Sequence, residues 1–193
     1  MKKSNLTILF FLFSFVEVNS ETKINTIYEG NVDAKIHIIV YESLTCGHCA
    51  NFHVKVYPDL KRDFIDKGIL KIEFRNFPLD IAALNASKIA HCKNDGDSDI
   101  LHFLYKNQKK WVKGTTVKEI NDHLKNFIDN QNLSLDYNKC INNEFIENHI
   151  LEDRIEGVKK FNINSTPTLI INNKKFEKAL NYKNLKKTLE KLI

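Results

Sequence analysis

The feature that most constrains the fold is a strand-like run that leads, within five residues, into a cysteine pair and a helical pattern. Residues 34–41 form a short β-branched run typical of a buried strand. Residues 46–67 predict a helix that Thr45 caps and Pro58 kinks. Residues 69–77 alternate and predict a second strand. This order of elements predicts a right-handed βαβ unit with a parallel pair of strands.

After the second strand the pattern changes to helices. The helical stretches are residues 81–92, 100–111, 116–128, 134–141 and 144–161. Thr116 and Glu119 have the spacing of a capping box, which marks the start of the third stretch. No connection is a linker rich in proline, glycine or serine, so the helices predict an insertion into one domain.

Strand patterns return near the end of the chain. Residues 167–171 predict a strand, and Asn172 and Asn173 predict a tight turn because asparagine tolerates a positive φ. A return strand over residues 174–179 and a helix over residues 182–193 follow. The sequence therefore predicts one α/β domain in two halves around a helical insertion. The halves are residues 21–77 and 151–193, and the insertion is residues 78–150.

The first twenty residues have the layout of a secretory signal peptide. Lys2 and Lys3 precede a mostly apolar run at residues 6–16, and residues 18–20 have the modest size of a cleavage site. The run is short for a membrane span, although an uncleaved anchor is the alternative. No cysteine follows it directly, which argues against a lipoprotein anchor. We predict export and a mature chain that starts near Glu21.

Composition and charge narrow the function classes. Hydrophobic residues make up 42% of the chain and charged residues 27%, which argues against disorder. The net charge of +5 comes almost entirely from lysine, since the arginines are Arg62, Arg75 and Arg154. Nucleic-acid readers usually cluster arginine. We therefore expect a solvated lysine-rich surface and no nucleic-acid partner.

The pair Cys46 and Cys49 stands where a strand gives way to a helix. A helix N-terminus offers free N–H groups and a positive dipole end, which lower the pKa of the first cysteine. Cys49, one turn later, can close on Cys46 as the resolving thiol. His48 can add a hydrogen bond or positive charge to the Cys46 thiolate and so favour the reduced form.

Three interpretations of this pair are a redox couple, half of a zinc site and an inert disulfide. Zinc needs two more ligands at suitable spacing. His48 and His53 are close in sequence, but His48 lies between the two cysteines and is poorly placed to bind a metal together with them. Four further histidines are scattered and are expected at the surface or at helix caps. They are His91, His102, His123 and His149. We favour the redox couple, with no metal.

Two segments resemble the thioredoxin superfamily, specifically the DsbA-like periplasmic thiol–disulfide oxidoreductases. The segments are residues 41–53, YESLTCGHCANFH, and residues 161–170, FNINSTPTLI. The resemblance covers nearly the whole mature chain and implies a thioredoxin fold, βαβ…ββα, with an inserted helical domain. It also implies that Pro167 is the family's cis-proline opposite the cysteines, and that Thr166 and Pro167 hold an extended substrate.

The resemblance implies an exported enzyme that introduces disulfides into translocating proteins in the periplasm. Cys46 would be the nucleophile and Cys49 the resolving thiol, with no organic cofactor beyond their redox-active disulfide. The expected partners are unfolded proteins with free cysteines and a quinone-linked membrane protein that reoxidises the pair. Many relatives carry a buried acid at the position of Val40. Glu42 shares its strand face by parity and either replaces that acid or is a solvated strand end.

Other functions remain open from the sequence. The dipeptide Gly47-His48 also occurs in disulfide isomerases, so a disulfide isomerase or reductase is the first alternative. Isomerases of this superfamily are usually dimers with an N-terminal dimerisation domain, and residues 21–34 are too short for one. This favours a monomeric oxidase. A thioredoxin-fold metal carrier and a redox-silent peptide-binding chaperone are further alternatives.

Cys92 and Cys140 both lie inside the helical block. In an oxidising compartment two remaining cysteines usually pair, and some DsbA relatives also have a second structural disulfide in the helical domain. We therefore predict a disulfide between them, with two free buried thiols as the alternative.

Overall fold

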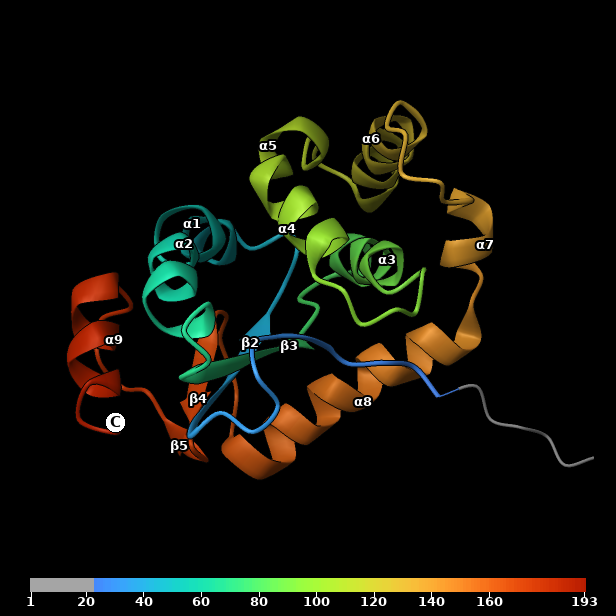
Figure 1. Ribbon diagram of the computed structural model, residues 1–193. Helices are drawn as coiled ribbons and strands as arrows, with labels where there is room; N and C mark the ends of the chain where they lie inside the picture. Colours follow the sequence, from blue (N-terminus) through green and yellow to red (C-terminus); the bar gives the residue numbers. More distant parts are fainter. Residues whose placement is uncertain (1–22) are drawn as a thin grey trace, which may run out of the picture.

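The computed structural model describes residues 23–193, and the predicted signal peptide at residues 1–20 lies outside this part of the chain. Its centre is a five-stranded sheet in the order β1-β3-β2-β4-β5 (Figure 1). The strands are β1 (Ile27–Glu29), β2 (Ile36–Glu42), β3 (Leu70–Asn76), β4 (Thr168–Ile171) and β5 (Lys174–Lys175). β2 and β3 run parallel, as the βαβ pattern predicts, and the other neighbours are antiparallel.

The helices fall into two groups along the chain. Those within the βαβ unit and at the C-terminus are α1 (Gly47–Lys55), α2 (Tyr57–Leu60), the π-helical turn η1 (Lys61–Ile65) and α9 (Tyr182–Leu189). Those between β3 and β4 are α3 (Ile81–Ala90), α4 (Asp99–Lys106), α5 (Gln108–Trp111), α6 (Val117–Asp129), α7 (Tyr137–Ile141) and α8 (Glu144–Phe161). Helices α3–α7 gather beside the sheet, and α8 leads back along it to β4 (Figure 1). In the part of the chain that is described, no helix has the length and apolar character to cross a membrane.

The prediction of a single helix over residues 46–67 is wrong in its N-cap and in its continuity. Cys46, not Thr45, is the N-cap of α1, and the Thr45 hydroxyl instead donates to Asp80 at 2.8 Å. The helix is interrupted at Val56, and the chain continues as α2 and η1. Pro58 explains the break because it has no N–H to donate to the carbonyl four residues earlier.

The two edges of the sheet differ from the sequence prediction. β1 was not predicted, because three residues are too few to give a clear alternation. Asn172 and Asn173 have positive φ values of 44° and 65° and form the turn between β4 and β5. β5 covers only two exposed residues of the predicted return strand, since the side chains beyond Phe176 are mostly charged and exposed.

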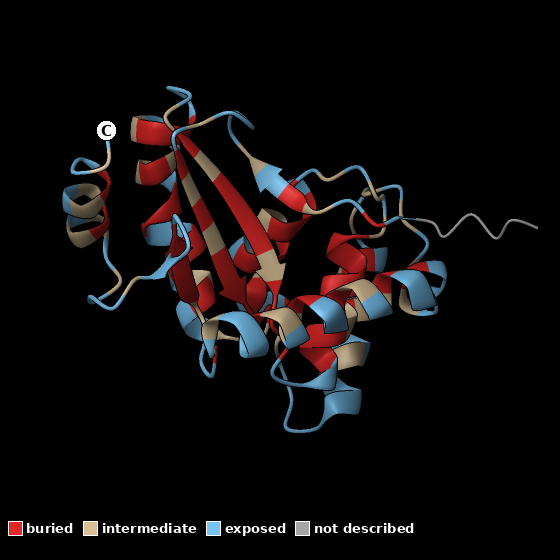
Figure 2. Cartoon of the chain, turned by 90° about the horizontal axis from the view of Figure 1, so that it is seen from below, coloured by how far each residue is buried: buried red, intermediate tan, exposed pale blue. Residues whose placement is uncertain are grey.

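The two faces of β2 pack against different partners. Ile36, Ile38 and Val40 belong to the main core cluster together with apolar residues of α1, α2 and α9. Tyr41 points to the opposite face, where its ring lies 6.1 Å from that of Phe161 on α8. The central strands β2, β3 and β4 are mostly buried between the helices, whose outer surfaces are exposed (Figure 2). By strand parity, Glu42 lies on the Val40 side of the sheet, next to α1.

Gly157 on α8 makes a close contact that predicts a specific stability change. A Cβ atom at this position would lie 2.7 Å from Cε1 of Tyr41, which is only 1% exposed and has no room to move. We expect Gly157→Ala to lower the free energy of unfolding by about 1–3 kcal/mol, as overpacking usually does, although alanine favours helices. Urea denaturation measures the change.

Gly47→Ala is the matched control for this substitution. Gly47 is also helical, and a Cβ atom there would meet nothing within 4 Å. We expect no loss of stability from this control. A Gly157→Ala protein as stable as the control would contradict the close packing of α8 on β2.

Candidate active site

The loop after β2 places two cysteines in different environments. Cys46 is half-buried at the N-cap of α1, and Cys49 is fully buried one turn later; both are free thiols. The backbone N–H of Cys46 donates to Ser43 at 3.0 Å. The side-chain amide of Gln108, from α5, donates to the carbonyls of Leu44 at 2.8 Å and Cys46 at 3.0 Å. A residue of the helical block therefore fixes the active-site turn.

The surroundings of Cys46 favour its thiolate. A hydrogen bond from the Cys49 thiol is the largest of several effects that lower the pKa of Cys46 to about 5, against the opposing effect of partial burial. The Thr166 side chain and the backbone N–H groups of Cys49 and His48 contribute further. At neutral pH Cys46 is therefore ionised, which is the reactive form of a cysteine.

Cys49 has the opposite tendency. Burial raises its pKa far above the ordinary value, and the nearby Cys46 and Glu42 raise it further. The Cys49 side chain is 0% exposed. Its sulfur is therefore a thiol in the reduced protein, and it must gain or lose a proton without direct contact with water.

Thr166 and Pro167 lie opposite Cys46, as the resemblance implies. The Thr166–Pro167 peptide bond is cis, and the Cys46 sulfur lies 3.4 Å from the Thr166 carbonyl oxygen. A groove of about 550 Å³ opens beside them. It is lined by both residues and by His48, Asn51, Phe52, Lys55, Val56, Leu180, Asn181 and Tyr182. The groove therefore lies next to the cis-proline turn that contacts Cys46.

His48 is exposed at the rim of this groove. Its backbone N–H supports the Cys46 thiolate. Within residues 23–193, no hydrogen bond joins its ring to Cys46. The tuning role of the ring stays a prediction.

Glu42 is buried, so it is not a solvated strand end. The residue is 4% exposed, and its Oε2 lies 2.6 Å from Nε2 of His53 on α1. Burial raises the pKa of Glu42 well above its ordinary value. A buried acid therefore lies on the face and strand that the sequence indicated, two residues beyond Val40.

Two histidines join this acid, which the sequence pattern did not indicate. His53 Nδ1 lies 2.8 Å from Nδ1 of His102, which was expected at the surface and instead packs between β1 and α1. The signal for His53 was its spacing of four residues after Cys49, which places both on one face of α1. His91 is the C-cap residue of α3, one of the two positions expected for it, but it is buried, and its ring lies 2.9 Å from the Asn76 amide.

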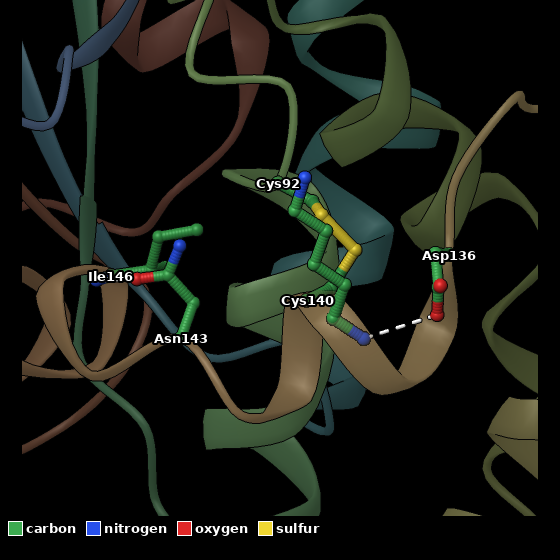
Figure 3. Close-up of a disulfide and its surroundings, with 6 residues drawn as sticks. Cys92, Asp136, Cys140, Asn143 and Ile146 are labelled. Carbon is green, nitrogen blue, oxygen red and sulfur yellow. Dashed lines mark hydrogen bonds between the residues drawn. A yellow bond between two sulfur atoms is a disulfide. The ribbon is translucent and has the colours of Figure 1, made fainter.

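A disulfide links Cys92, just after α3, to Cys140 in α7 (Figure 3). The Cα atoms are 5.2 Å apart, and the bridge closes a separation of 48 residues. The backbone N–H of Cys140 donates to the carbonyl of Asp136 at 3.0 Å, which fixes the turn around the bridge. The disulfide ties the short helix α7 to α3. Among the described residues no group of three or more potential ligands is arranged to hold a metal ion.

Comparison with known proteins places this architecture in a family. The family profile described as Thioredoxin matches residues 22–191. The crystal structure of Wolbachia pipientis alpha-DsbA1 is 30% identical, with a TM-score of 0.76 over 87% of this chain and 90% of that one. The chain belongs to the thioredoxin family, and within it to the DsbA-like proteins.

Curated relatives are similar over different lengths. A putative protein-disulfide oxidoreductase of Rickettsia bellii is 36% identical over 98 residues, which is 50% of this chain and 38% of that protein. Disulfide bond formation protein D of Bacillus subtilis is 28% identical over 84% of this chain and 74% of its own. The chain spans only 38% to 62% of the length of the rickettsial relatives.

The low pKa of Cys46 predicts how its reactivity depends on pH. In the reduced protein the alkylation rate should rise with pH and reach half its maximum near pH 5, because only the thiolate reacts. Iodoacetamide labelling at a series of pH values, with Cys46→Ser as the blank, measures this profile. A midpoint near the ordinary cysteine value of about 8.5 would contradict the arrangement.

The Cys92–Cys140 bridge predicts a large contribution to stability. Its loop of 48 residues corresponds to about 4 kcal/mol in the chain-entropy estimate. We expect the Cys92→Ala, Cys140→Ala double variant to lose about this much free energy of unfolding, measured in urea. Alkylation of the native, unreduced parent protein should leave both cysteines unlabelled, and labelling of either would refute the bridge.

Proposed function

We propose that this protein is an exported thiol–disulfide oxidoreductase that introduces disulfides into other proteins. The observation that carries the proposal is the asymmetry of the pair: Cys46 is ionised beside an open groove, and Cys49 is buried behind it. Stabilising the Cys46 thiolate stabilises the reduced form, and an easily reduced disulfide is a strong oxidant.

The reaction starts from the Cys46–Cys49 disulfide. A substrate thiolate attacks the Cys46 sulfur, and Cys49 leaves and takes a proton. A second substrate thiolate then attacks the substrate sulfur of the mixed disulfide and releases Cys46 as a thiolate. The substrate loses two electrons, and the cysteine pair gains them, so no organic cofactor is needed.

Thr166 and Pro167 are proposed to hold the substrate. The Thr166 carbonyl lies 3.4 Å from the Cys46 sulfur, so a chain that pairs with this backbone would bring its own sulfur to Cys46. Phe52, Val56 and Leu180 supply apolar contacts along the same groove. His48 at the rim is proposed to stabilise the Cys46 thiolate when substrate approaches.

The domain arrangement is proposed as two thioredoxin-like halves, residues 21–77 and 151–193, around a helical insertion at residues 78–150. The boundary at residue 150 falls inside α8. Ile146 and Ile150 near the start of α8 pack with Leu84 of α3, whereas Gly157 near its end packs on β2. One helix therefore belongs to both parts and supports a rigid connection.

The cellular setting is also a proposal. The signal-peptide pattern of residues 1–20 and the similarity to alpha-DsbA1 support secretion to the periplasm and action as a monomer on unfolded proteins. The Bacillus subtilis relative is named a disulfide bond formation protein. Each turnover leaves the pair reduced, so a reoxidising partner is required, and we propose a quinone-linked membrane protein.

Equilibration of the Cys46–Cys49 pair in glutathione buffers tests the direction of the reaction. We expect a reduction potential near the oxidising end of the superfamily, about −120 mV, because the reduced form carries a stabilised thiolate. The oxidised protein should also restore activity to a reduced protein that needs its disulfides, and Cys46→Ser should abolish this.

Two results would overturn the proposal. A potential near −270 mV would indicate a reductase. Activity that survives Cys46→Ser would indicate a chaperone that does not use its cysteines.

A further inference from the structure

Four titratable side chains form one continuous line from the buried end of the active site toward the surface. Oε2 of Glu42 on β2 lies 2.6 Å from Nε2 of His53 on α1. The other ring nitrogen of His53 lies 2.8 Å from Nδ1 of His102 on α4. Nε2 of His102 lies 2.7 Å from Oε1 of Glu29 on β1. Each imidazole therefore uses both nitrogens within the line.

Counting protons in this line limits the states that it can adopt. Three contacts need three protons, whereas two ionised carboxylates and two neutral imidazoles supply only two. We place the third proton on Glu42, because burial raises the pKa of this carboxyl and disfavours the carboxylate. Burial also lowers the pKa of His53 to about 3, so this ring is neutral. Hydrogen bonds from His102 and other neighbours outweigh partial burial and keep the pKa of Glu29 low.

All donors then point the same way. The Glu42 hydroxyl donates to His53, the Nδ1–H of His53 donates to His102, and the Nε2–H of His102 donates to the Glu29 carboxylate. A line of hydrogen bonds with one direction can pass a proton by shifting each hydrogen to its acceptor. The imidazoles change tautomer and carry no lasting charge.

Aromatic rings enclose the inner part of this line. Tyr105 stacks on His53 with ring centroids 4.0 Å apart, and Tyr57 stacks on His102 at 4.2 Å. The His53 side chain is 2% exposed, while that of His102 is 23% exposed. His102 also lines a surface pocket of about 290 Å³. The line is thus closed at Glu42 and open to solvent at its outer end, where Lys61 and Ser98 also contact Glu29.

Cys49 needs such a path. It is fully buried, yet it must take up a proton when the disulfide opens and release one when the disulfide forms again. Oε1 of Glu42 is buried without a hydrogen-bond partner among the described residues, and so is the Tyr105 hydroxyl. A protonated Glu42 can accept the Cys49 proton only while it passes its own proton on.

We propose that Glu42, His53, His102 and Glu29 form a proton relay between Cys49 and solvent. This inference rests on the proposed disulfide exchange at the same cysteines. When Cys49 attacks a mixed disulfide, its proton goes to Oε1 of Glu42, the Oε2 proton goes to His53, and one proton leaves through His102 and Glu29. When a substrate reduces the pair, the transfers run backward, so both imidazoles return to their starting tautomers after one cycle.

Reaction of the reduced protein with oxidised glutathione separates the relay from the first chemical step. The Cys46 thiolate attacks glutathione disulfide and releases one glutathione thiolate, which needs no proton from Cys49. Cys49 must then lose its proton to attack the Cys46 sulfur and release the second glutathione. Acid quenching, thiol alkylation and mass measurement follow the reduced, mixed-disulfide and oxidised forms over time.

We expect His102→Ala to slow the second step about tenfold or more and to leave the first step unchanged, so that the mixed disulfide accumulates. His102 lines an open pocket, so added imidazole should restore the second step. Pyrazole has the same size but is a far weaker base and should not restore it. If the alanine variant does not fold, His102→Gln keeps a polar side chain and gives the same test without the rescue.

His37→Gln is the matched control. His37 also pairs with a carboxylate, since its Nε2 lies 3.2 Å from Oε2 of Glu73, but it is not part of the relay. It should leave both steps unchanged.

Three results would overturn the relay and leave the proposed function standing. They are an unchanged second step, equal slowing of both steps, and a recovery with imidazole that is no greater than with pyrazole. Failure of the first step in the unmodified protein would instead refute the proposed function.

Discussion

The difference in solvation between two sulfur atoms is the constraint on which the rest of the site depends. β2 ends at the N-terminus of α1, so Cys46 meets free backbone N–H groups and Cys49 is carried one turn into the core. The first position stabilises an anion, and the second excludes one. A pair of equally exposed thiols would have no preferred nucleophile. The strand-to-helix transition therefore assigns the two chemical roles before any other residue contributes.

Buried polar side chains around this pair form hydrogen-bonded networks that join separate elements, although Glu42 Oε1 and the Tyr105 hydroxyl have no partner among the described residues. Glu42 has His53 as its partner, and His53 has His102. On the other side of β3, Asp153 of α8 accepts from Arg75 at 2.7 Å and from the Asn76 amide at 2.8 Å. Burying such groups without partners costs several kcal/mol. Each network crosses between elements distant in sequence, so each also fixes how a helix sits on the sheet.

The sequence predicted what local patterns encode. The strand β2 was predicted from its β-branched run and the start of α6 from its capping box, and the predicted bounds of α8 match the structure. The cysteine pair and Pro167 were found from their motifs. His102 could not be found in this way, because its partners are distant in the sequence. His53 is 49 positions away and Glu29 is 73 positions away. The sequence left open whether Glu42 is buried. Strand parity predicts the face of the sheet on which a side chain lies, but it does not predict whether a helix covers that face.

The helical block contributes directly to the site. Gln108 of α5 holds the carbonyls of Leu44 and Cys46, Tyr105 of α4 covers His53, and His102 of α4 continues the line from Glu42. Because α4 and α5 lie within the block that the Cys92–Cys140 bridge stabilises, loosening this block would free the active-site turn and open the buried acid to water. A water-exposed Glu42 would ionise, and its charge would then disfavour the Cys49 thiolate. The insertion therefore belongs to the redox site physically, since it sets the solvation on which the difference between the two cysteines depends.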